Sequence, residues 1–119
     1  MLNENNNLRT IYGIRSLSNK DQAYRTGQNY WTSPIWININ FLCIKILYEY
    51  KDYHYLSNLN GFTIARDIGV EYSKLRNDVM LNIVKNYSEN GFIWETYDDN
   101  TGQGQYNHPF TGWSALLVN

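Results

Sequence analysis

Apolar residues recur at intervals of three and four along two stretches of the chain, which is the pattern of amphipathic helices with one buried face. The first stretch predicts a helix over 35–50, with Pro34 at its first position and Ser33 or Thr32 as its cap. Its apolar positions are Ile35, Trp36, Ile39, Leu42, Cys43, Ile46, Leu47 and Tyr50. We therefore expect one broad face of this helix to be buried.

A second, longer helix is predicted from Ile64 to Tyr87, and Asn90-Gly91 is a typical C-terminal stop for it. Its apolar positions are Ile64, Ala65, Ile68, Tyr72, Leu75, Val79, Ile83 and Tyr87. Such a helix spans roughly 35 Å, at about 1.5 Å per residue. Turn-forming residues at 58–61 precede it, so the two helices are expected to form an antiparallel hairpin.

The segment from Gly91 to Pro109 has no helical period and predicts a long loop, and such loops are commonly functional. Thr111 is expected to cap a third helix that starts at Gly112. If this helix returns beside the first, segments 10–34 and 91–111 meet at one end of the bundle. Both segments are rich in Trp, Tyr, Gly, Asn and Asp, so the functional site is expected there.

The chain has 119 residues, enough for one domain or part of one. Ten basic and 11 acidic side chains give a net charge of -1, which excludes a basic surface for nucleic acid or for anionic membranes. The sequence shows neither a targeting signal nor an apolar run near the ~20 residues of a membrane span. Residues 1–10 are expected to be a disordered, Asn-rich leader. The one-sided helices predict a fragment of a larger all-α domain.

Candidate chemistry in the converging segments rests on one carboxylate and several rings. Glu95 stands between Trp94 and Tyr97, whose rings can exclude water and prepare a carboxyl group for acid–base chemistry. A solvent-facing loop glutamate remains the alternative. Trp31 and Trp36 flank a helix start, where flat rings suit the apolar faces of sugars or serve as core anchors.

No metal or cofactor is predicted from the residues. The segment Asp98-Asp99-Asn100-Thr101-Gly102 predicts an ordinary polar turn, because it lacks the ligand spacing of an EF-hand. His54 and His108 are far apart and have no ligand-type neighbours at metal-binding spacing.

Four motifs stand in an order and spacing that resemble a known family. They are Tyr12-Gly13-Ile14-Arg15-Ser16-Leu17-Ser18, Asn29-Tyr30-Trp31-Thr32-Ser33-Pro34-Ile35-Trp36-Ile37-Asn38-Ile39-Asn40, Gly91-Phe92-Ile93-Trp94-Glu95-Thr96-Tyr97 and Pro109-Phe110-Thr111-Gly112-Trp113-Ser114-Ala115-Leu116. From about Ile11 onward the chain resembles glycoside hydrolase family 63. The resemblance implies an all-α fold, a partial (α/α)6 barrel made of the last few helices of a six-hairpin toroid, with 11–119 as the C-terminal part of the catalytic domain.

The resemblance also implies an activity and a location. The reaction is inverting hydrolysis of the terminal α-1,2-linked glucose of the N-glycan precursor Glc3Man9GlcNAc2, on the lumenal side of the endoplasmic reticulum membrane. Glu95 aligns with the family's general base, and the aligned rings of Trp31, Trp36, Trp94 and Tyr97 would line the glucose subsite. The implied partner is an oligosaccharide, without nucleic acid or cofactor, and any membrane anchor lies outside these residues.

Two departures from the family pattern keep other functions open. Thr32 and Ser33 stand where the family usually has Arg and Gly, and no segment matches the motif of the general acid, an Asp. The 119 residues alone are therefore expected to be inactive. The alternatives are another α-glucosidase on the same barrel, or an inactive carbohydrate-binding remnant that lacks the general acid.

Overall fold

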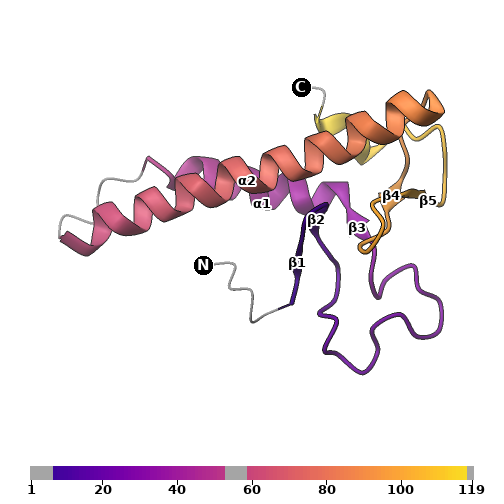
Figure 1. The fold of residues 1–119 in the computed structure, drawn as a ribbon, viewed down its shortest axis with the longest axis horizontal. Helices are drawn as coiled ribbons and strands as arrows, with labels where there is room; N and C mark the ends of the chain where they lie inside the picture. Colours follow the sequence, from indigo (N-terminus) through magenta and orange to yellow (C-terminus); the bar gives the residue numbers. More distant parts are fainter. Residues whose placement is uncertain (1–6, 53–58, 118–119) are drawn as a thin grey trace.

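Two long helices dominate the computed structural model, which describes residues 7–52 and 59–117 (Figure 1). Helix α1 spans Ile37–Tyr50 and helix α2 spans Leu59–Asn90. They pack side by side and run in opposite directions (Figure 1). The predicted antiparallel hairpin is confirmed, whereas His54 and residues 1–6 of the expected leader lie outside the described residues.

Helix α1 begins later than its apolar pattern predicts, because Ile35–Trp36 form strand β3 instead. A β-branched and an aromatic residue favour extended backbone, and here they gain strand partners. The expected cap is wrong. Trp36 is the N-cap and makes no side-chain capping bond, while the Ser33 hydroxyl donates to Asn29 Oδ1 at 2.7 Å. At the other end, the Lys51 N–H donates to Leu47 O at 3.0 Å and closes the last turn.

Helix α2 ends where the sequence predicts and begins earlier. Gly91 follows the last helical residue with φ of 81°, the left-handed conformation of a glycine stop, and its N–H donates to Tyr87 O at 2.7 Å. The helix begins at Leu59 rather than Ile64, so the turn predicted at 58–61 is wrong for 59–61. Extending an existing helix adds one hydrogen bond per residue without a new nucleation cost, which overrides weak turn preferences.

Five short strands form two small sheets that the sequence did not predict. Strands β1 (Arg9–Thr10) and β2 (Gly13–Ile14) form one antiparallel pair. Strand β4 (Thr96–Tyr97) lies between β3 and β5 (Gly104–Gln105) in an antiparallel sheet. Two corrections follow: Arg9–Thr10 are not part of a disordered leader, and 91–109 is not a plain loop. Strands of two residues are too short for their alternation to be visible in the sequence.

The predicted third helix is a 3-10 helix, η2, over Trp113–Leu117. The Ala115 N–H donates to Gly112 O at 3.1 Å, three residues back, as this tighter helix requires. Most residues in elements are therefore helical, in agreement with the helical part of the predicted fold class, and the small sheets are an addition to it.

The core lies where α1, α2 and the strands meet. Its buried apolar side chains are Ile14, Ile35, Ile37, Leu75, Val79, Ile83 and Tyr97. Asn40 of α1 is fully buried among them and makes three hydrogen bonds: Oδ1 accepts from Ile14 N at 2.7 Å, and Nδ2 donates to Ile14 O and Trp36 O, both at 2.9 Å. This amide ties the start of α1 to strand β2 and thereby anchors the end of the molecule that carries the candidate site.

The prediction that one broad apolar face of α1 is buried holds for only some of its positions. Cys43 and Leu47 pack against the core, whereas Ile39, Leu42 and Ile46 are about half exposed. Helix α1 contacts α2, η2 and the strands on one side, so the remaining apolar positions face away from them. No helix within 7–52 and 59–117 is long and apolar enough to cross a membrane.

Candidate active site

The two segments expected to converge do meet at one end of the helical hairpin. The Tyr30 hydroxyl donates to Glu95 Oε1 at 2.5 Å across 65 positions of sequence. Arg25 Nη2 lies 2.6 Å from Asp99 Oδ1 across 74 positions. Strand β3, which directly follows the first segment, pairs with β4 of the second, so the backbone also brings the two segments together. The predicted convergence of 10–34 with 91–111 is therefore confirmed.

Glu95 lies at the centre of this meeting point, directly before strand β4, and its residue is only 3% exposed. Its backbone N–H donates to Asn107 O at 3.0 Å, and its carbonyl accepts from Trp113 Nε1 at 3.1 Å. Its carboxylate Oε2 accepts from Asn107 Nδ2 at 2.7 Å and from Asn107 N at 3.3 Å. Backbone and side chain are thus both held, and the carboxylate has a defined orientation.

The hydrogen bonds to Glu95 leave it capable of acting as a base. A carboxylate offers about four acceptor sites, two on each oxygen. Asn107 fills both sites of Oε2, and Tyr30 fills one site of Oε1. The remaining acceptor site is on Oε1, beside the Tyr30 hydroxyl. The bond to Glu95, with burial second, raises the pKa of Tyr30 to about 12, so this hydroxyl stays a donor at neutral pH.

Aromatic rings gather around Tyr30, the donor to the Glu95 carboxylate. The Tyr30 ring meets Trp31 and Trp36 edge-on, with centroids 4.9 and 4.7 Å away. The Trp31 ring stacks on Trp36, with centroids 4.6 Å apart and planes 3° apart. Trp36 is 4% exposed and Trp31 is 66% exposed. Trp31 thus presents an open ring face that Trp36 supports from beneath, a surface suited to the apolar face of a sugar.

The other two rings that the resemblance assigns to the subsite, Trp94 and Tyr97, are packed against neighbouring residues. Tyr97 is fully buried in the core, and burial raises its pKa to about 12. Trp94 packs on Phe92 and His108, with ring centroids 5.2 and 4.0 Å away. Trp94 also lies directly against Gly104 of β5, where a Cβ atom would overlap its ring. Tyr97 and Trp94 therefore support β4 and β5, and of the predicted rings Trp31 is the exposed one.

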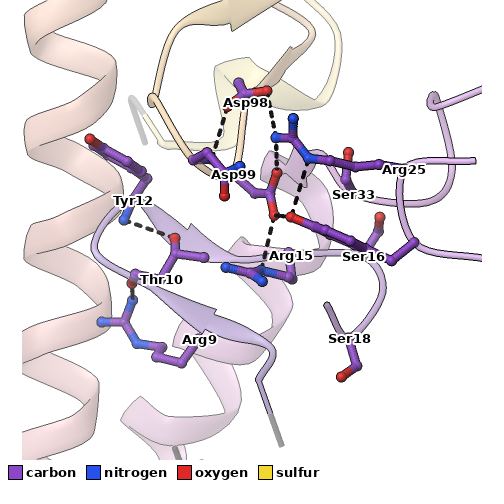
Figure 2. A network of polar contacts seen from close by, with 12 residues as sticks. Arg9, Thr10, Tyr12, Arg15, Ser16, Ser18, Arg25, Ser33, Asp98 and Asp99 are labelled. Atoms are coloured by element: carbon purple, nitrogen blue, oxygen red, sulfur yellow. Dashed lines mark hydrogen bonds and ion pairs between the residues drawn. The ribbon is translucent and has the colours of Figure 1, made fainter. Parts of the chain in front are cut away.

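An ionic cluster around the buried Asp99 joins the segment before Tyr30 to the turn after β4 (Figure 2). The side chain of Asp99 is fully buried, with Arg15 Nε 3.0 Å from its Oδ2 and Arg25 Nη2 2.6 Å from its Oδ1. The Tyr24 hydroxyl donates to Asp99 Oδ2 at 2.7 Å. The bond to Asp99 is also the main cause that raises the pKa of Arg25. Two cations thus compensate the burial of this carboxylate and hold the loop in place.

The neighbouring Asp98 completes the predicted polar turn. Its N–H donates to Gln103 O at 2.8 Å, and its carbonyl accepts from Gly102 N at 2.9 Å. Arg25 Nη2 lies 2.9 Å from its Oδ2. The two aspartates are therefore engaged with arginines. Across the described ranges 7–52 and 59–117, no group of three or more His, Cys, Asp or Glu is arranged to hold a metal ion.

Several residues that build the site have no individual prediction from the sequence. Tyr30 and Arg15 occur there only within motifs, and Asn107 and Arg25 occur in none of them. The sequence nevertheless contains a usable signal for the two arginines. Two arginines in one converging segment face two aspartates in the other, and opposite charges are expected to pair where segments meet.

Fold and site together define a mostly helical protein with a buried, oriented carboxylate close to aromatic rings. Glycosidases use a pair of carboxyl groups for hydrolysis, and Glu95 offers one of them. The model of the glycosyl hydrolase family 63 C-terminal domain matches residues 1–119. The chain therefore belongs to glycosyl hydrolase family 63, and the resemblance noted from its motifs is confirmed.

Three curated relatives agree with this assignment. A Schizosaccharomyces pombe protein named probable mannosyl-oligosaccharide glucosidase is 42% identical over 120 residues, covering 100% of this chain and 14% of the relative. The Saccharomyces cerevisiae mannosyl-oligosaccharide glucosidase is 36% identical over 108 residues, covering 91% of this chain and 13% of the relative. Alpha-glucosidase 2 of Arabidopsis thaliana is 34% identical over 112 residues, covering 90% of this chain and 13% of the relative. The chain thus spans about one seventh of the length of these relatives.

Proposed function

We propose that this chain contributes the general base and part of the glucose subsite to an inverting α-glucosidase. The observation that carries the proposal is the Glu95 carboxylate. It is buried and held by Asn107, it keeps one acceptor site on Oε1, and it lies next to the ring that touches the exposed Trp31. The named activity of the relatives, mannosyl-oligosaccharide glucosidase, supports the same proposal.

In this proposal Glu95 accepts a proton from water while the water oxygen bonds to the anomeric carbon of the sugar. The bond from that carbon to the glycosidic oxygen breaks, and a second carboxyl group protonates the leaving oxygen. The two groups must be roughly 6.5–9.5 Å apart to leave room for the water, which gives inversion. The acid is not assigned to any residue described here, because Asp98 and Asp99 are engaged with arginines.

The substrate class in the proposal is a terminal α-linked glucose on an oligosaccharide, specifically the α-1,2-linked glucose of Glc3Man9GlcNAc2. Trp31 would stack against the sugar, and Trp36 would support Trp31 from beneath. The scaffold would be part of an (α/α)6 toroid, in the lumen of the endoplasmic reticulum. The family and the printed names of the relatives support this proposal.

The test is made in a chimera, because the chain spans 14% of its Schizosaccharomyces pombe relative. The chain replaces the matched segment of that relative, and release of glucose from Glc3Man9GlcNAc2 is measured. We expect Glu95→Gln to lower kcat by about 10²- to 10⁴-fold with little change in KM. Glu89→Gln, at an exposed position near the end of α2, is the matched control and should leave kcat unchanged.

The outcomes separate the proposal from its alternatives. Unchanged turnover in Glu95→Gln removes Glu95 from the mechanism. If the chimera releases no glucose from the glycan but hydrolyses other α-glucosides, the substrate class is wrong and the base assignment stands. Glycan binding without any turnover favours the carbohydrate-binding remnant. The first product anomer, read by proton NMR, must be β-glucose for an inverting reaction on an α-linked substrate.

A further inference from the structure

We infer that Tyr30 is a positioning residue for the Glu95 carboxylate: its hydroxyl orients Oε1 so that the remaining acceptor site points at the attacking water. This inference rests on the proposed role of Glu95 as the base. Its direct evidence is the 2.5 Å hydrogen bond from the Tyr30 hydroxyl to Oε1.

The two oxygens of Glu95 are held by different parts of the chain. Oε2 is held twice by Asn107, which follows β5 and is a near neighbour in the same hairpin. Oε1 is held by Tyr30, which belongs to the loop before β3. Asn107 alone leaves the Oε1 side of the carboxylate unrestrained, so Tyr30 sets the direction of the oxygen that receives a proton.

Tyr30 is itself held firmly enough to do this. Its ring makes edge contacts with three other rings, Trp31, Trp36 and Tyr106, with centroids between 4.7 and 4.9 Å away. Earlier in the same loop, Arg25 is tied to Asp98 and Asp99 by ion pairs of 2.9 and 2.6 Å. A hydroxyl on a ring packed in this way has little freedom, which is what an orienting contact requires.

The chemistry of the donor fits the role. A hydrogen bond to an ionised carboxylate is stronger than one between neutral groups, and a phenol supplies it from a rigid ring. The pKa of Tyr30 is raised to about 12, first by this bond and then by burial, so the phenol keeps its proton throughout the range in which a glycosidase works. The hydroxyl therefore remains a donor to Oε1 and does not compete for the proton that the attacking water gives up.

The experiment uses the chimera described above with Glc3Man9GlcNAc2 as substrate. Tyr30→Phe keeps the ring and removes the hydroxyl, and we expect kcat to fall about 10- to 100-fold while KM changes less than about twofold. Tyr106→Phe is the matched control, because Tyr106 packs on Tyr30 but its hydroxyl makes none of the described bonds to Glu95. Equal kcat values for the two variants would overturn the inference.

A double-mutant comparison separates positioning from general packing. In Glu95→Ala, added azide attacks the anomeric carbon as an anion and needs no base, and the leaving oxygen departs with the proton of the acid to give β-glucosyl azide. If Tyr30 acts through Glu95, adding Tyr30→Phe leaves the azide-dependent rate unchanged. A further loss of 10-fold or more means that Tyr30 serves packing and the inference is wrong. Where azide does not react, the slow residual hydrolysis by Glu95→Ala is measured with and without Tyr30→Phe, and the same two outcomes apply.

A second variant covers the case in which Tyr30→Phe does not fold. A 3,5-difluorotyrosine at position 30 keeps ring and hydroxyl but ionises at lower pH. We expect kcat to gain an alkaline limb that the unsubstituted chimera lacks, because the ionised phenol no longer donates to Oε1. An unchanged pH–kcat profile overturns the inference. Full turnover of Glu95→Ala without azide, in contrast, refutes the proposed base itself.

Discussion

Asp98 shows how much a single side chain contributes at the site. Its Oδ1 accepts from the N–H groups of Asn100 and Thr101 at 2.9 and 2.8 Å, which is the bonding of an Asx turn. Its Oδ2 accepts from Arg25 at 2.9 Å. Burial disfavours the charged form, but the two backbone bonds and Arg25 outweigh it, so the pKa of Asp98 is lowered. The folded chain therefore stabilises the carboxylate of Asp98.

This lowered pKa predicts a loss of stability in acid. The unfolded chain protonates Asp98 near its ordinary pKa of about 3.9, before the folded chain does. The contribution of Asp98 is complete above that value and is lost as the pH falls below about 4 through the folded pKa. Urea unfolding of the 119-residue chain, followed by circular dichroism between pH 7 and pH 3, measures this loss.

Asp98→Asn is the informative variant for that measurement, because its amide keeps an oxygen for the backbone bonds but loses the charge. We expect its free energy of unfolding to depend less on pH below about pH 4 than that of the unsubstituted chain. Asp67→Asn is the control, since Asp67 lies on α2, where its partner is the exposed Arg66 at 3.5 Å. Parallel pH profiles for Asp98→Asn and the unsubstituted chain would contradict the assignment.

At the scale of elements, one amide on α2 fastens the hairpin of β4 and β5. Asn86 is 4% exposed; its Oδ1 accepts from Gly104 N at 2.8 Å and its Nδ2 donates to Gly102 O at 2.9 Å. Gly102 has φ of 73°, and a Cβ there would collide with Asn82 and Tyr12. The turn can approach the helix this closely because it carries glycine at that position.

Removing this amide should loosen the hairpin. Asn86→Ala leaves the Gly104 N–H and the Gly102 carbonyl without their partner, and we expect the free energy of unfolding to fall by about 1–3 kcal/mol. Asn90→Ala is the matched control one turn later, because its described bond is a single one from Nδ2 to Asn86 O. Chemical unfolding of both variants of the chain gives the comparison. A loss in Asn86→Ala no larger than that in Asn90→Ala would argue against the fastening.

The same contacts bear on Asn86-Tyr87-Ser88, which is an acceptor sequence for N-linked glycans. The Asn86 Nδ2 atom that would carry the glycan donates to Asn82 O and to Gly102 O, both at 2.9 Å. A glycan on this nitrogen is incompatible with those bonds, so the folded hairpin excludes the modification at this asparagine.

At the scale of the whole molecule, the chain is more extended than its length requires. The radius of gyration is 15.4 Å, whereas a compact domain of this length has about 13.5 Å. An apolar surface of α1, formed by Ile39, Leu42 and Ile46, is about half exposed. These positions are spaced as on the contact face of a packed helix. Exposed apolar surface of this kind promotes association.

We therefore expect the 119-residue chain to associate in solution through the α1 apolar surface. Leu42→Glu combined with Ile46→Glu should shift it toward monomer without loss of helix content, because both side chains are more than half exposed. Sedimentation velocity and circular dichroism measure the two quantities. Leu47→Glu is the contrasting control, since Leu47 packs against the core and its substitution should unfold the chain. Unchanged sedimentation in the double variant would place the association elsewhere.

The helices and their order were determined by the sequence itself. Helical periodicity depends on neighbours three and four positions apart, so α1 and α2 could be predicted from local pattern, as could the stop at Gly91. From two antiparallel helices and a third element, the meeting of segments 10–34 and 91–111 followed by topology alone. The motifs also indicated the family, because they recur in fixed order.

The partners of each site residue were decided by tertiary structure. The donor to Glu95 Oε1 is 65 residues away, and no local rule distinguishes Tyr30 from the other tyrosines of the converging segments. The two-residue strands β3 and β4 form because the fold brings their backbones together to pair. Neither segment has strong strand propensity over a sufficient length. The burial of Tyr97 in the core and the packing of Trp94 on Phe92 and His108 were decided in the same way. Burial is a property of what packs around a side chain, and the sequence specifies those neighbours only through the completed fold.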